Sequence, residues 1–185
     1  LNVPILIIFI IIAKPFVILL LTEKWAPMIP YLQLICVIGF VYPFVVVNHQ
    51  LILAIGKSKL AFKINIISNS LRIINLVLMY RYGIIYIIFG EILIQIITSI
   101  MLSIYVYKFI DYSLLKQLYD IRKTLIFGLL SLLGGFLVNS LFNDLLLSLI
   151  LSGGIVILLY VGLQYLFNHN MWINVINLKN NFNRK

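Results

Sequence analysis

The chain has few of the residues from which catalytic and metal sites are built. Its 185 residues include five acidic residues, two histidines and one cysteine. Cys36 therefore has no partner within the chain for a disulfide, and His49 and His169 lie too far apart in sequence to form a metal-binding motif. The sequence also has no nucleophile–base pair and no glycine-rich phosphate loop. We expect neither an enzyme nor a bound cofactor or metal.

Charged residues are also scarce, at 10% of the chain, whereas hydrophobic residues make up 63% and the mean hydropathy is +1.14. These values are typical of integral membrane proteins. The net charge of +9 does not indicate nucleic-acid binding, because the basic residues are scattered between apolar segments and form no stripe with interleaved aromatic residues.

Six apolar segments are long enough to cross a hydrocarbon layer of about 30 Å as helices. They lie near residues 3–21, 28–55, 60–80, 84–107, 122–140 and 144–167. The expected fold is an all-α, polytopic membrane helix bundle. Pro15 predicts a kink in the first segment. Residues 108–123 alternate between apolar and charged side chains at helical spacing, which predicts an amphipathic segment on the membrane surface.

The basic residues are distributed unequally between the two sides of the predicted membrane. Ten flank the segments on one side, including those of a basic tail at residues 168–185, against Lys24 and Arg81 on the other. By the positive-inside rule, the basic side and the C-terminus lie in the cytoplasm. An apolar segment is under way by Val3 with no signal-peptide pattern, so we expect the chain to be the C-terminal part of a longer protein.

Two neighbouring segments, 60–80 and 84–107, carry polar residues at intervals of three and four, which places them on one face of each helix. These residues are Asn65, Ser68, Asn69, Arg72, Asn75, Glu91, Gln95, Thr98 and Ser99. A charge at the bilayer centre costs about 2.5–3.5 kcal/mol on insertion scales, so such residues need partners. The helical rise places Arg72 and Glu91 at similar distances from the turn at Gly83, which predicts an ion pair.

This pair has two interpretations that the sequence leaves open. It either locks the packing of the two helices, or it lines a polar cavity in which Arg72 meets an anionic group. Lys14 either joins the same cavity or extends its flexible stem toward the interface. His49 either titrates near neutral pH or forms a hydrogen bond in the packing of the helices.

Four stretches of the sequence, in this order and at this spacing, resemble one known family. They are AKPFVILL at 13–20, TEKWAPMIPYLQLI at 22–35, LAIGKSK at 53–59 and RYGIIYIIFGEI at 81–92. Together they resemble the polysaccharide-transporter (Wzx-type) flippases over about residues 5–125. The likeness departs at Thr22 and Tyr86, where the family often has glycine.

The resemblance implies a place in the superfamily that also holds the MATE drug exporters, whose members have two lobes of six helices around a central cavity. The chain would form the second lobe of such a transporter in the bacterial inner membrane. It would flip an undecaprenyl-diphosphate-linked oligosaccharide by alternating access, coupled to a proton or sodium ion. Other polysaccharide-assembly proteins and membrane lipids would be its partners.

In this picture Lys14 and Arg72 attract the diphosphate or acidic sugars, and Glu91 neutralises Arg72 or carries a proton. Hydrogen bonds to sugar hydroxyls would come from Asn69, Asn75 and Gln95. Two alternatives remain: a MATE-like exporter of cationic drugs, and a membrane enzyme such as a polymerase. Buried cations outnumber the buried acid, which disfavours the exporter, and the short outer links disfavour the polymerase.

Overall fold

The structure is a computed structural model that describes residues 2–142 and 144–167. Within these ranges the chain forms six long helices and no strand. They are α1 (Asn2–Leu21), α2 (Ile29–Ala54), α3 (Ser58–Met79), α4 (Ile84–Ile110), α5 (Leu114–Leu141) and α6 (Leu145–Phe167), with a short 3-10 helix, η1 (Glu23–Met28), between α1 and α2. All six are long and apolar enough to cross a membrane. The chain is therefore a membrane-embedded, all-α helix bundle, as predicted.

The predicted boundaries agree with the structure to within three residues for every helix except α5. That helix begins at Leu114 instead of residue 122. Asp111, in a left-handed conformation, ends α4, and the side chain of Ser113 caps α5 by accepting a hydrogen bond from the backbone N–H of Lys116. The amphipathic segment at 108–123 is thus divided between α4 and α5 and does not form a helix of its own. The predicted basic tail at 168–185 lies outside the described residues.

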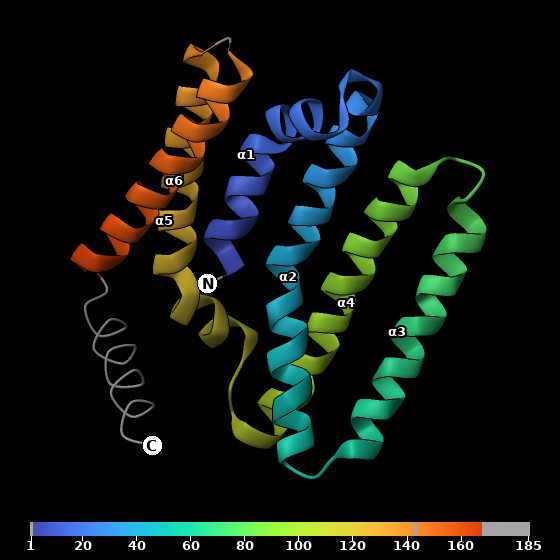
Figure 1. Cartoon of the computed structure of the whole chain (residues 1–185). Coiled ribbons are helices and arrows are strands. Elements are labelled where there is room, and N and C mark those ends of the chain that lie inside the picture. Colours follow the sequence, from blue (N-terminus) through green and yellow to red (C-terminus); the bar gives the residue numbers. More distant parts are fainter. Residues whose placement is uncertain (1, 143, 168–185) are drawn as a thin grey trace, which may run out of the picture.

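The helices alternate in direction and stand side by side (Figure 1). The α5–α6 pair packs on α1, which packs on α2; α2 packs mainly on α4, and α3 lies at the outer edge against α4. Helix α1 does not pack against α3 or α4. The α2–α3 and α4–α5 connections lie at one end of the bundle, lower in Figure 1, which we call the basic end. The α3–α4 turn lies at the opposite end.

Two features of the sequence shape the packing around α1. Figure 1 shows α1 changing direction near its upper end, and Pro15 lies inside that helix, as the predicted kink requires. A Cβ atom at Gly135 of α5 would lie 2.5 Å from side-chain atoms of both Ile11 in α1 and Val156 in α6. The absence of a side chain at Gly135 therefore lets these three helices approach one another closely.

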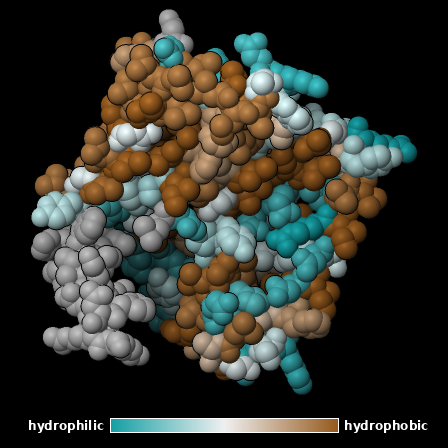
Figure 2. Space-filling view, viewed as in Figure 1, coloured by the Kyte–Doolittle hydropathy of each residue, from teal (hydrophilic) through white to brown (hydrophobic). Residues whose placement is uncertain are grey.

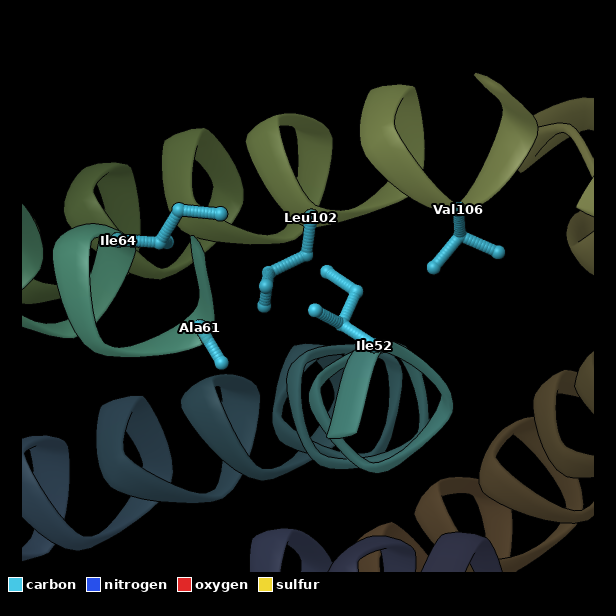
Figure 3. Packing of buried hydrophobic residues seen from close by; sticks show 5 residues of the cluster. All are labelled: Ile52, Ala61, Ile64, Leu102 and Val106. Atoms are coloured by element: carbon cyan, nitrogen blue, oxygen red, sulfur yellow. The ribbon is translucent and has the colours of Figure 1, made fainter. Parts of the chain in front are cut away.

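A hydrophobic cluster joins α2, α3 and α4 near the basic end. Its buried members are Ile52, Ala61, Ile64, Leu102 and Val106 (Figure 3). Each is at most 1% exposed, so the cluster fixes the three helices relative to one another. From this anchor, α3 and α4 run together toward the turn at the opposite end, and their facing side chains become polar.

Candidate functional site

The hairpin of α3 and α4 turns sharply at its tip, which sets the register of the two helices. Gly83 has a φ of 107°, a left-handed conformation that suits glycine, and α4 starts directly after it. Arg72 in α3 and Glu91 in α4 each lie seven residues from the hairpin ends of their helices, Met79 and Ile84. At the helical rise this places both about 10 Å from the same end.

Arg72 is held by three partners on the two helices. Its Nε donates to Glu91 Oε1 over 2.9 Å, which confirms the predicted ion pair. One terminal nitrogen donates to Asn69 Oδ1 at 2.9 Å, and the other donates to Gln95 Oε1 at 3.1 Å. The structure therefore brings together Asn69, Arg72, Glu91 and Gln95, four of the residues singled out from the sequence. We call these four residues the arginine cluster.

The arginine cluster lies at the surface of the described chain and is not sealed within it. The side chain of Arg72 is 39% exposed and that of Glu91 is 28% exposed, whereas Gln95 is buried. Figure 2 shows hydrophilic surface gathered over α4 and its junction with α3, between hydrophobic areas. A charged pair at this position remains open to a molecule outside the hairpin.

Further polar contacts continue the seam between α3 and α4 on both sides of the arginine cluster. Toward the turn, Asn75 Nδ2 donates to the carbonyl of Ile87 at 2.9 Å, in a space that a Cβ atom at Gly90 would fill. Toward the basic end, the hydroxyls of Ser68 and Thr98 are hydrogen-bonded at 2.8 Å and are buried. Most of the predicted polar residues are thus used in contacts between the two helices.

The seam reaches α2 through His49. Its Nε2 lies 3.0 Å from Asn65 Nδ2 of α3. This contact favours the packing interpretation of His49.

Lys14 does not join this arrangement. It lies on α1, which packs against α2, α5 and α6, whereas the arginine cluster belongs to α3 and α4. Its side chain is exposed and forms no ion pair or hydrogen bond with any described residue. The two cations that the sequence placed in one candidate cavity thus lie on helices that do not contact each other.

A second polar cluster, which sequence reasoning missed, connects α5 to the rest of the bundle. The amides of Asn48 in α2 and Gln117 in α5 exchange two hydrogen bonds of 2.9 Å, and Gln117 Nε2 also donates to Ser103 Oγ of α4 at 2.9 Å. All three side chains are at most 5% exposed. The charges around Gln117 gave it the pattern of a surface segment, so nothing in the sequence indicated that it pairs with Asn48.

The arginine cluster has hydrogen-bond donors that a ligand could use. A guanidinium presents five N–H donors, and three of those of Arg72 have partners among residues 2–142 and 144–167. The same ranges contain no group of three or more metal-binding side chains.

No family model matches the chain, and comparison with curated proteins and with solved structures returned no match. The resemblance to the polysaccharide flippases therefore stays a prediction from motifs.

Proposed function

We propose that the chain is part of a transporter that moves an undecaprenyl-diphosphate-linked oligosaccharide across the bacterial inner membrane. The observation that carries this proposal is the state of Arg72: an ordered, partly exposed guanidinium on a membrane-spanning helix, with two N–H donors not used by the described chain. Within a hydrocarbon layer these two unused donors favour a polar or anionic ligand over contact with lipid chains. The substrate class rests on the motif resemblance.

A diphosphate suits the geometry of the arginine cluster. Arginine binds phosphate oxygens through two parallel hydrogen bonds, and Arg72 keeps one unused N–H donor on each of its two terminal nitrogens. Glu91, Asn69 and Gln95 hold the guanidinium plane, so its direction is set before the ligand arrives. Preorganisation of this kind raises affinity, because the ligand does not have to order the side chain.

The other candidate residues have different parts in this proposal. Asn75 is occupied by the Ile87 carbonyl and supports the hairpin instead of offering hydrogen bonds to sugars. Lys14 lies apart from the arginine cluster, so the proposed phosphate site does not include it. Glu91 lowers the cost of inserting Arg72 and, being partly exposed, is the group in the cluster that can take up a coupling proton.

The exposure of Glu91 also favours a second candidate, an exporter of cationic drugs, in which the carboxylate would bind the cargo. The two functions assign opposite roles to the ion pair. In a flippase, removing Arg72 abolishes transport. In a cation exporter, removing Glu91 does so, while neutralising Arg72 leaves the carboxylate of Glu91 free to bind the cargo.

The test uses the gene that encodes this chain, expressed in a strain that lacks its own flippase and supplies matched glycan machinery. Surface polysaccharide should be restored, lost in Arg72→Ala and partly retained in Arg72→Lys, at equal protein levels. Arg81→Ala is the matched control, because Arg81 is an exposed arginine in the turn outside the cluster. No restoration by the intact gene, together with drug resistance that Glu91→Gln removes, would overturn the proposal in favour of the exporter.

The orientation proposed with this function places the basic end in the cytoplasm. Among the described residues, seven cations belong to the two connections at that end and their flanking turns, against Lys24 and Arg81 at the other. An impermeant thiol reagent applied outside intact cells should label Tyr82→Cys and leave Ser58→Cys unlabelled, in a background without Cys36. The reverse pattern would contradict the orientation.

A further inference from the structure

Four exposed lysines lie close to two connections that meet at the basic end. Lys57, Lys59 and Lys63 belong to the α2–α3 turn and the first turns of α3, and Lys108 belongs to the last turn of α4. We call these four residues the basic platform. It is separate from the arginine cluster, which lies toward the other end of the same hairpin.

Two contacts hold the platform together. The ammonium group of Lys57 lies 5.5 Å from the centre of the Phe109 ring, which joins the α2–α3 turn to the end of α4. Beneath them, the hydrophobic cluster of Ile52, Ala61 and Val106 fixes the same three helices (Figure 3). The lysines are therefore carried by a rigid base, although Lys57 and Phe109 are 52 positions apart in the sequence.

The positive charge of the platform is not neutralised by the described chain. The acidic residues near this end are engaged elsewhere: Asp111 pairs with Lys116 at 3.7 Å, and Asp120 accepts a 2.7 Å hydrogen bond from the hydroxyl of Tyr112. That hydrogen bond raises the pKa of Tyr112, with burial and the charge of Asp120 adding to the effect. No carboxylate of the described residues lies within 4.0 Å of a platform ammonium group.

Apolar side chains are interleaved with the lysines. Phe62 is 66% exposed, Phe109 41% and Ile110 45%. Aromatic and aliphatic side chains beside lysines, at the end of membrane-spanning helices, are placed at the depth of the lipid headgroups. A soluble anion would gain nothing from contact with these apolar side chains, whereas a phospholipid presents acyl chains and a charged headgroup together.

From this juxtaposition we propose that the basic platform is a binding site for an anionic phospholipid, whose phosphate-bearing headgroup contacts the lysines while its acyl chains lie against Phe62, Phe109 and Ile110. The site joins the α2–α3 and α4–α5 connections through one ligand. It does not depend on what the arginine cluster transports.

The experiment follows thermal unfolding of the purified chain in neutral detergent during titration with phosphatidylglycerol, or with phosphatidylcholine of the same acyl chains. Phosphatidylglycerol should stabilise the chain at lower concentration, and added salt should weaken the difference by screening. The double variant K57Q/K108Q should need about 25-fold more phosphatidylglycerol for half-maximal stabilisation, from about fivefold per lysine. Glycerol phosphate, which has no acyl chains, should not replace the lipid.

Two further variants keep the result interpretable. K24Q/R81Q removes two cations from the opposite end and should retain the wild-type preference, and K57R/K108R should retain it because the charges remain. Equal stabilisation by the two lipids, an equal loss in K24Q/R81Q, or full replacement by glycerol phosphate would each overturn the proposal. Loss of the lipid preference with surface polysaccharide still restored in cells would separate this site from the transport function.

Discussion

Replacing Arg72 by alanine should destabilise the hairpin of α3 and α4 and leave Glu91 without its partner. The substitution removes the 2.9 Å contact to Glu91 and two further hydrogen bonds, to Asn69 and Gln95. Breaking a fully buried pair costs about 3–5 kcal/mol, because the remaining charge is stranded. The side chains of Arg72 and Glu91 are 39% and 28% exposed on the described chain, so the pair is only partly buried and we expect a smaller loss, of about 2–3 kcal/mol.

A double-mutant cycle separates the ion pair from the rest of this loss. Unfolding free energies would be measured in mixed micelles with increasing denaturing detergent for Arg72→Ala, Glu91→Ala and the double variant. The coupling energy should be about 1–3 kcal/mol, the range for residues in direct contact. Arg81→Ala is the matched control and should change stability by less than about 0.5 kcal/mol, because Arg81 is exposed in the turn.

A stabilising ion pair is contradicted if the two single losses simply add in the double variant. Additivity would mean that Arg72 and Glu91 do not stabilise each other in the membrane environment, whatever their distance in the hairpin. A loss for Arg81→Ala as large as that for Arg72→Ala would also contradict it, since the cost would then follow from removing any arginine.

The remaining predictions concern packing. Gly90→Ala should lower the free energy of unfolding by about 1–3 kcal/mol, because the added Cβ would overlap the side chain of Asn75. Adding Asn75→Ala to the same chain should recover part of this loss in detergent unfolding, and no recovery would contradict the contact. Gln117→Ala should cost about 1–3 kcal/mol by leaving a buried amide of Asn48 unpaired. The exposed Gln50→Ala is its control, and equal unfolding midpoints for the two variants would refute the buried cluster.

The sequence predicted the fold because each helix can be recognised from its own apolar segment. Long apolar segments separated by Gly56 or Gly83 have few alternatives in a membrane, where every backbone group must be paired within its own helix. The start of α5 was missed because Lys116, Asp120 and Arg122 break the apolar pattern. A helix extends past the hydrocarbon layer as easily as it ends there, so hydropathy alone cannot locate its first residue.

The candidate site was predictable where its residues share one hairpin. The spacing of Asn69, Arg72, Glu91 and Gln95 depends only on helical periodicity and the position of the turn, so their meeting followed from the sequence. The separation of Lys14 from this cluster depends on which helices pack together, and the positions of the apolar segments in the sequence do not show which helices are neighbours. The pairing of Asn48 with Gln117, across 69 residues, was hidden for the same reason.

The most direct test of the central claim is whether the arginine cluster binds a lipid diphosphate. Binding of a polyprenyl diphosphate and of the corresponding polyprenol would be compared for the chain in lipid nanodiscs, in wild type, Arg72→Ala and Arg81→Ala. Wild type and Arg81→Ala should prefer the diphosphate, and Arg72→Ala should bind it about 10–100-fold more weakly, as expected for the loss of charge-assisted hydrogen bonds. Equal affinity of wild type for the diphosphate and the alcohol, or undiminished diphosphate binding by Arg72→Ala, would contradict this claim.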